Sequence, residues 1–344
     1  MSVYKLNSTI KVKEYLERKK DFQETDEYGK DNNSNDKDKM LYGSLLLEKN
    51  TVDEIKFATK ELWRILKTVK EAIIEFEDDE LIRMGYPENL VSFMKIDYLN
   101  RYSPLSRFDF IIGDNGIKTI GLNTVSPSLI KETLQTNHQV VEYENSRSKK
   151  MIFQKTKSEK SKIENPKIEN PKNENWKIKI SEFIKGKNEK MNFLNSPNEN
   201  AKDSIKASYL ETLYEASKYV GILNPMIVVA SLPYEDDKEN YRQVKFIYDN
   251  MPYNYGRVDL LNIKSLNIVD GEGIFKPNGE KVDILVVPAL QHMKFAEDKI
   301  FKLVEQKKLA LINPPSAHIL QNKFSLYFLW NMYKILYKIL WQYR

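Results

Sequence analysis

Apolar residues recur every three or four positions between residues 51 and 74, which is the spacing of one face of a helix. The set is Ile55, Ala58, Leu62, Ile65, Leu66, Val69 and Ile73. Thr51, with Glu54 three residues later, has the sequence of a capping box. The pattern therefore predicts an amphipathic helix that begins at Thr51. A turn and a short helix are predicted to follow over residues 78–90, where Gly85 and Pro87 interrupt the chain.

Short runs of apolar, β-branched residues alternate with helical patterns after residue 203. Strands are predicted at 225–231, 258–268, 273–275, 282–288 and 309–312. Helices are predicted at 205–219, 241–250 and 298–306. This alternation is typical of a mainly parallel sheet covered on both faces by helices. The fold class is therefore mixed α/β, built in layers.

A low-complexity segment divides the chain. Residues 149–202 contain KIENPKIENPKNEN, a composition that buries too little apolar surface to offset the entropy of ordering. We expect a disordered insert there, although Trp176 leaves a docking segment as the alternative. Residues 1–40 are polar and are also expected to be disordered. An N-terminal α/β lobe would then span 41–148, and a second α/β lobe would span 203–344.

The composition and charge of the chain indicate which partners and which compartment to expect. The 344 residues carry a net charge of +5, and the 54 basic and 49 acidic residues are mixed, so a nucleic-acid partner is not expected. The chain has no cysteine, and its three histidines are scattered. The N-terminus shows no apolar signal region, which favours the cytoplasm. Lys334 and Lys338 interrupt the aromatic run 324–343, so we expect a covered helix there and no transmembrane segment.

Residues 107–123 read RFDFIIGDNGIKTIGLN, two β-prone runs around a turn, and predict a hairpin. A two-residue Asn115–Gly116 loop would mix apolar and polar side chains on each face. A three-residue loop, 114–116, places glycine at the left-handed position of a bulged turn and separates the faces. We therefore predict the second register, which pairs Arg107 with Asn123 and Asp109 with Gly121.

This register gathers Arg107, Asp109 and Asn123 at the open end of one hairpin face. A guanidinium holds carboxylate or phosphate oxygens bidentately, and the oxygens of aspartate and asparagine are hard ligands suited to Mg²⁺. The set therefore fits phosphoryl chemistry. The alternative is an ordinary surface salt bridge between Arg107 and Asp109, which spacing alone favours.

Two blocks of sequence resemble a known family. Arg107-Phe-Asp-Phe, Gly116-Ile-Lys118 and Leu122-Asn123-Thr-Val-Ser126-Pro-Ser128 resemble the signature of the glutathionylspermidine synthase family. The run from Leu311 to Lys323, LINPPSAHILQNK, leading toward Trp330, is similar to the family's second block. The blocks occur in the family's order. The resemblance covers roughly residues 41–330, apart from the insert.

The resemblance implies a pre-ATP-grasp fold and an ATP-dependent amide ligase that uses ATP and Mg²⁺. Such enzymes phosphorylate a peptide carboxylate, and an amine such as spermidine attacks the acyl phosphate. By similarity, Arg107 would be the catalytic residue that stabilises developing charge. Asp109 and Asn123 would hold the metal, and Ser126 and Ser128 would bind the carboxylate substrate.

The chain departs from the family pattern at three places. Gly121 stands where the family has a glutamate, and Val125 stands where it has an acidic residue, which lowers the negative charge available to Mg²⁺. The chain also ends about twenty residues after Lys323, before an ATP-grasp module. We therefore expect either an incomplete ligase or a non-catalytic remnant, a binding module that pairs with a partner chain or a second copy through the C-terminal helix.

Overall fold

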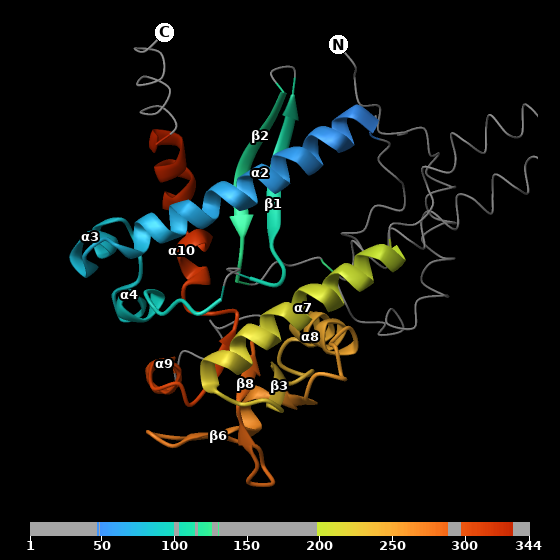
Figure 1. The fold of residues 1–344 in the computed structure, drawn as a ribbon, viewed down its shortest axis with the longest axis vertical. Helices are drawn as coiled ribbons and strands as arrows, with labels where there is room; N and C mark the ends of the chain where they lie inside the picture. Colours follow the sequence, from blue (N-terminus) through green and yellow to red (C-terminus); the bar gives the residue numbers. More distant parts are fainter. Residues whose placement is uncertain are drawn as a thin grey trace, which may run out of the picture. The chain divides into compact units, whose positions relative to one another are not determined.

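A computed structural model describes residues 47, 49–99, 103–113, 116–125, 130, 198–287 and 297–332 (Figure 1). The predicted N-terminal segment 1–40, nearly all of the insert and the last part of the C-terminal helix lie outside the described residues. Residues 48–130 and 202–344 belong to one compact unit.

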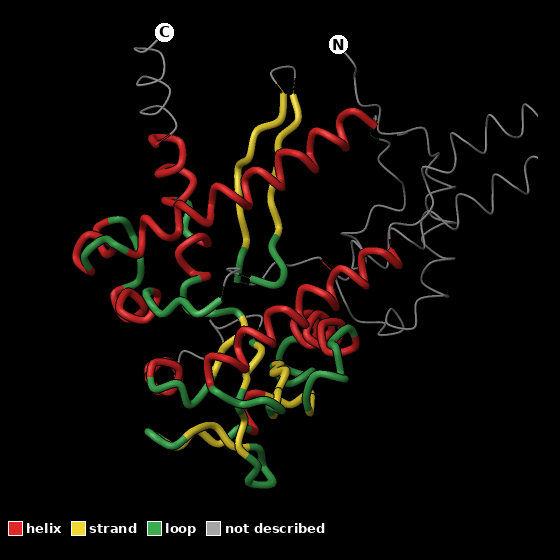
Figure 2. Tube along the Cα trace, in the orientation of Figure 1, coloured by secondary structure: helices red, strands yellow, loops and turns green. Residues whose placement is uncertain are grey.

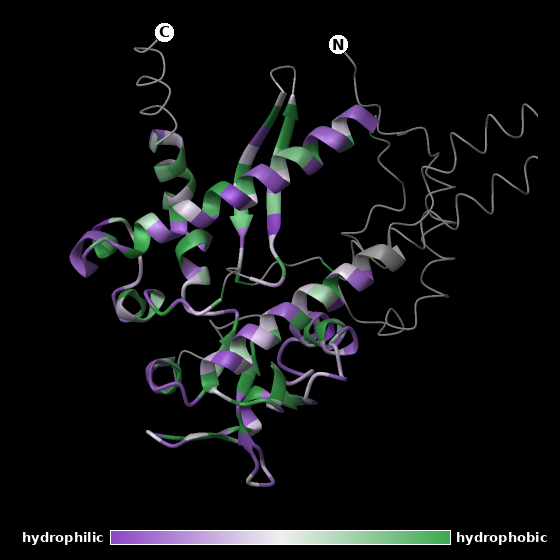
Figure 3. Cartoon of the chain, viewed as in Figure 1, coloured by the Kyte–Doolittle hydropathy of each residue, from purple (hydrophilic) through white to green (hydrophobic). Residues whose placement is uncertain are grey.

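The predicted parallel sheet is confirmed. It has the order β4-β3-β8-β9, and every neighbouring pair is parallel. The strands are β3 (Met226–Ser231), β4 (Arg257–Asn262), β8 (Ile284–Val286) and β9 (Ala310–Ile312). All residues of β3, β8 and β9 are buried, and β3 and β8 are coloured as hydrophobic in Figure 3. Their β-branched runs suit strands packed on both faces.

Helices alternate with these strands, as the sequence predicts, which confirms a mixed α/β fold (Figure 2). They are α7 (Asn198–Val220), α8 (Lys238–Asp249) and α9 (Glu297–Glu305). Asp237 caps α8, because its side chain accepts a hydrogen bond from the backbone N–H of Asn240 at 2.9 Å. The predicted helices are thus present; α7 begins seven residues earlier than predicted, and the boundaries of the other two differ by one to three residues. The prediction of one strand over 258–268 was wrong, because β4 ends at Asn262 and a 3-10 helix (Ile263–Ser265) follows it.

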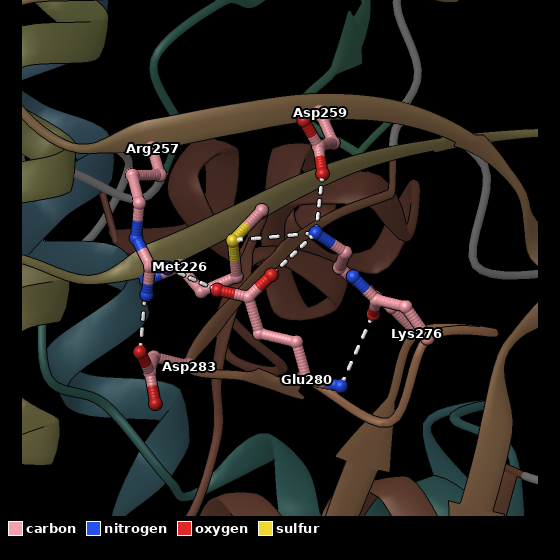
Figure 4. A network of polar contacts seen from close by, with 7 residues as sticks. Met226, Arg257, Asp259, Lys276, Glu280 and Asp283 are labelled. Atoms are coloured by element: carbon pink, nitrogen blue, oxygen red, sulfur yellow. Dashed lines mark hydrogen bonds and ion pairs between the residues drawn. The ribbon is translucent and has the colours of Figure 1, made fainter.

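A charged cluster joins a small antiparallel sheet to the parallel one (Figure 4). The small sheet contains β5 (Asn267–Val269), β6 (Gly273–Phe275) and β7 (Lys281–Val282). Nζ of Lys276 lies 2.6 Å from a carboxylate oxygen of Asp259 on β4 and 2.6 Å from one of Glu280. These bonds, the one with Asp259 foremost, raise the pKa of the Lys276 ammonium. The cluster therefore stabilises the turn between β6 and β7 against β4.

In the described part of the chain before the hairpin, the helices are α2 (Lys49–Ile74), α3 (Asp78–Arg83) and α4 (Glu88–Met94). The predicted amphipathic helix is present, but it begins at Lys49, and Thr51 lies inside it. The prediction of Thr51 as the cap was wrong, because Thr51 is the third residue of the helix and a cap residue precedes the first turn. Gly85, with a positive φ of 87°, and Pro87 occupy the turn between α3 and α4, as predicted.

The hairpin consists of β1 (Arg107–Gly113) and β2 (Gly116–Asn123). At its open end the predicted register is confirmed, with Arg107 opposite Asn123 and Asp109 opposite Gly121. Nearer the turn the prediction was wrong. A bulge between Asp109 and Phe110 shifts the register by one, so that Phe110 lies opposite Thr119 and Gly113 lies opposite Gly116.

The bulge has a physical reason. In the predicted register, Lys118 would share the apolar face with Phe110. The extra residue, Ile120, moves Lys118 to the exposed face and brings Ile117 onto the face of Phe110. The bulge leaves Ile120 53% exposed, and Ile111, which lies on the face of Asp109 in either register, is 54% exposed. The charged side chain thus reaches water, while two isoleucines remain at the surface.

One hydrophobic core spans the segments before and after the insert. It contains Leu66, Val69 and Ile73 of α2 together with Leu285 and Leu311 of the parallel sheet. Burial of such side chains is the main source of stability in a domain of this kind. The helical pattern at 51–74 and the β-branched runs after residue 203 therefore contribute to the same core.

A buried ion pair crosses this core. Nζ of Lys70 lies 2.6 Å from Oδ2 of Asp97, and the Lys70 side chain is only 1% exposed. The other carboxylate oxygen of Asp97 accepts a hydrogen bond from Oγ of Ser316 at 2.7 Å. The three side chains join α2, the segment after α4 and the start of the second sequence block.

The chain's C-terminal aromatic run is helical over residues 324–332. Phe328 packs edge-on against Phe76 with ring centroids 5.8 Å apart, and Phe324 packs edge-on against Tyr86 at 6.5 Å. In the described part of the chain, no helix is long and apolar enough to cross a membrane.

We expect Asp97→Ala to lower the free energy of unfolding by roughly 3 kcal/mol, because it leaves a buried ammonium without its carboxylate. Lys70→Met should cost clearly less, since it removes the buried charge and keeps the apolar stem. Urea denaturation of both variants checks this order. Equal losses in the two variants, or a larger loss in Lys70→Met, would contradict it.

Candidate functional site

The structure brings Arg107, Asp109 and Asn123 together at the open end of the hairpin, which we call the ledge. Arg107 and Asn123 are directly opposite each other in the strand pair, and Asp109 is two residues along β1 on the same face. The side chains of Arg107 and Asp109 are 37% and 36% exposed. The ledge is therefore accessible to a ligand.

The two charged side chains of the ledge form a bidentate pair. Nε of Arg107 donates to Oδ1 of Asp109 at 2.8 Å, and Nη2 donates to Oδ2 at 3.3 Å. The salt bridge that spacing favours is therefore present. It also fixes the plane of the guanidinium, so a ligand would meet an oriented arginine.

Gly121 leaves room for this pair. A Cβ atom at Gly121 would lie 2.9 Å from Oδ2 of Asp109, which is closer than such atoms normally approach. The position at which the family carries a glutamate is thus covered by the carboxylate of Asp109. Any side chain at residue 121 would have to displace that carboxylate from its present place.

Asn123 is held by a residue from the far end of the chain. Oε1 of Gln321 accepts hydrogen bonds from the backbone N–H groups of Thr124, at 2.8 Å, and Val125, at 3.3 Å. Nε2 of Gln321 donates to Oδ1 of Asn123 at 3.0 Å. A single glutamine side chain therefore forms hydrogen bonds with Asn123, the last residue of the hairpin, and with the two residues that follow it.

Further bonds join the same stretch to the second sequence block. Oγ1 of Thr124 donates to the carbonyl of Ala317, which begins α10 (Ala317–Gln321), at 2.7 Å. Nδ2 of Asn313 donates to the carbonyl of Val125, and Oδ1 of Asn313 accepts from Oγ of Ser103 at 2.9 Å. The two blocks that carry the family resemblance are thus in direct contact.

No role for Gln321 or Asn313 was predicted from the sequence. Both lie in the run LINPPSAHILQNK that carries the second part of the resemblance, which is the available signal. Nothing in the local pattern pairs them with residues 123–125, because the contacts span some two hundred positions. Ser126 and Ser128, the predicted substrate-binding residues, lie outside the described residues.

The ledge fits Mg²⁺ poorly. Asp109 already has both carboxylate oxygens on a guanidinium, and the amide oxygen of Asn123 already accepts a hydrogen bond from Gln321. Gly121 adds no ligand. Over the described ranges, no three His, Cys, Asp or Glu side chains gather in a way that could hold a metal ion. Mg²⁺ prefers several unencumbered oxygens at short distance, so the residues of the ledge do not fit a metal-assisted step.

An open groove of about 530 Å³ lies near the start of β1, lined by parts of α2, residues 104–108 and α7. Trp63 and Phe108 form part of its apolar wall, and Lys56 and Lys60 contribute cations. Phe108 and Arg107 are neighbours in a strand, so their side chains point to opposite faces. The groove is therefore separate from the ledge.

His318 lies in α10 beside the contacts described above. Its Nε2 atom is buried and has no hydrogen-bond partner within the described ranges. Burial lowers the pKa of His318 from 6.5 to about 4, so the ring is neutral at pH 7. A neutral ring without a partner at Nε2 is in keeping with a histidine of the core.

A scan of the chain against protein-family models finds no match, and a search of curated proteins finds no relative. The relation to the glutathionylspermidine synthase family therefore stays an interpretation of the two sequence blocks.

His318 predicts a pH dependence of stability. Its pKa is lower in the folded chain than in the unfolded one, so the unfolded state binds more protons between pH 6.5 and about 4. Stability should therefore fall as the pH drops through this window, by roughly 3 kcal/mol from this residue. His318→Leu should remove that part of the pH dependence. Urea denaturation at several pH values checks it, and parallel curves for variant and parent would contradict it.

Proposed function

We propose that this chain is a carboxylate–amine ligase of the glutathionylspermidine synthase type, with the ledge as the place where the anionic part of the substrates binds. The observation that supports the proposal is the direct contact between its two family-like blocks through Gln321, Asn123 and Thr124. Both segments resemble the same family, and a site built from both of them requires that they be in contact.

The reaction has two steps. A carboxylate oxygen of a peptide attacks the γ-phosphorus of ATP, which forms an acyl phosphate and releases ADP. The amine then attacks the carbonyl carbon, inorganic phosphate leaves with the former carboxylate oxygen, and the nitrogen loses a proton. Negative charge builds on oxygen atoms in both steps, so an oriented cation beside the reacting group lowers the barrier.

Arg107 is the residue of the ledge that suits this task. Its bidentate pair with Asp109 orients the guanidinium before a substrate arrives, and its side chain is partly exposed. Pre-organised donors stabilise developing charge better than donors that must reorient. In this proposal Asp109 is a positioning residue, which acts through Arg107.

The aromatic helix at 324–332 favours a second candidate, a binding module that meets a partner chain or a second copy. One side of this helix packs on Phe76 and Tyr86, whereas Tyr327 is 62% exposed and Trp330 is 55% exposed. Tyrosine and tryptophan are enriched at the centres of protein interfaces.

Calorimetric titration with Mg²⁺-ATP tests the first candidate. We expect saturable binding that Arg107→Ala weakens by about tenfold or more, because a charge-assisted contact is lost. Asp109→Ala should weaken it less, since the arginine remains but is no longer oriented. Lys118→Ala is the matched control, which removes one positive charge from the same hairpin near its turn. Absence of binding at millimolar nucleotide would reject the ligase proposal for this chain alone.

Sedimentation velocity tests the second candidate. If the exposed side of the helix mediates self-association, Tyr327→Ser combined with Trp330→Ser should shift the protein toward monomer at tens of micromolar, while circular dichroism stays unchanged. A parent protein that is monomeric at millimolar concentration would count against a second copy as the partner.

A further inference from the structure

The orientation of the Asn123 amide follows from a chain of hydrogen bonds that begins at the backbone. The backbone N–H groups of Thr124 and Val125 can only donate, so the side-chain atom of Gln321 that meets them must be its oxygen. The NH₂ group of Gln321 is then at the other end of its amide and donates to Asn123. Asn123 must therefore present its oxygen to Gln321 and direct its own NH₂ group away from it.

No alternative orientation satisfies these groups. If the Asn123 amide turned over, its NH₂ group would face the NH₂ group of Gln321, two donors without an acceptor between them. If Gln321 turned over as well, its NH₂ group would face two backbone N–H groups. The two backbone donors therefore determine the amide orientation at both side chains.

We propose that the ledge is an anion site that works without a metal, in which Asn123 contributes a hydrogen-bond donor beside Arg107 and Gln321 is the positioning residue. The inference concerns the same ledge as the proposed function and deepens it, by naming the chemistry of what binds there: a carboxylate or a phosphate group.

The side-chain groups of the ledge favour the same conclusion. Asp109, the one carboxylate of the ledge, has both oxygens on the guanidinium of Arg107, so it offers little to a cation. Gly121 supplies no further oxygen from its side chain. Among the described residues, the ledge holds one guanidinium and, opposite it on β2, an amide whose oxygen already accepts a hydrogen bond. The Arg107–Asp109 pair is neutral overall, so the ledge favours an anion through the N–H groups that its side chains donate and not through net charge.

The experiment uses two probes, acetylglycine for a peptide carboxylate and methyl phosphate for a phosphoryl group. Each is titrated into the full chain in EDTA, and backbone amide shifts are followed by NMR. We expect saturable shifts near residues 107 and 123 for at least one probe, with the tighter probe identifying the preferred anion. Addition of Mg²⁺ in place of EDTA should leave the affinity unchanged.

Gln321→Glu is the decisive variant, because the new carboxylate still accepts from Thr124 and Val125 but cannot donate to Asn123. Freed from Gln321, the Asn123 amide can turn its oxygen outward beside a new acid. Anion affinity should fall at least tenfold, and binding of Mn²⁺, read by its paramagnetic broadening, should appear. Asn322→Asp is the matched control, with the same added charge on the neighbouring residue, and should show neither change.

Asn123→Asp is the second variant, in case Gln321→Glu does not fold. It removes the donor and should abolish anion binding in EDTA. The inference is overturned if neither probe binds in EDTA, if the parent protein binds either probe only with Mg²⁺ present, or if Asn322→Asp and Gln321→Glu behave alike. Mg²⁺-ATP binding with no binding of either probe in EDTA would reject the inference and leave the proposed function standing. The reverse result would reject the ligase and leave the anion site.

Discussion

The ledge depends on two side-chain amides that hold the end of the hairpin. Gln321 and Asn313 bond the backbone of residues 124 and 125, and Gln321 also bonds the side chain of Asn123. A two-stranded hairpin is at best marginally stable alone in water. Its open end is held here because side chains of the second block satisfy the buried backbone of residues 124 and 125, which follow the hairpin directly, and an unsatisfied group in that position would be costly.

The second sequence block, residues 311–323, also bonds the segment that precedes the hairpin. Ser316 donates to Asp97, which pairs with the buried Lys70, while the hydroxyl of Tyr98 exchanges hydrogen bonds with the backbone of Leu311. Burial raises the pKa of the Tyr98 hydroxyl, so it remains a neutral donor and acceptor. Segments before the hairpin, the hairpin itself and the last strand of the parallel sheet therefore meet around residues 311–321. A change at the ledge is consequently also a change at the edge of the core.

Much of this fold could be predicted from the sequence, because its strands are short, β-branched and fully buried. The register of the hairpin could be predicted only in part from the pattern of apolar and polar residues. Periodicity assumes one register along the whole strand pair, and the bulge opposite Asp109 and Phe110 breaks that assumption to expose Lys118. The two pairs that position the ledge, Arg107 with Asn123 and Asp109 with Gly121, were nevertheless predicted, since they lie on the other side of the bulge from the turn. The contact of Gln321 with Asn123 could not be predicted, because no local pattern records a bond between residues so far apart in the chain.

The ledge also shows what a motif leaves open. Arg107, Asp109 and Asn123 are residue types that suit a metal-assisted site, and their spacing brings them together as expected. Whether an asparagine offers oxygen or nitrogen to a ligand is decided by the partner of its other end. Here that partner is Gln321, whose own orientation is determined by two backbone N–H groups. An asparagine at the metal position of a motif can thus donate a hydrogen bond to an anion. The reason is that a residue outside the hairpin bonds its side-chain oxygen and so directs its NH₂ group toward the ligand.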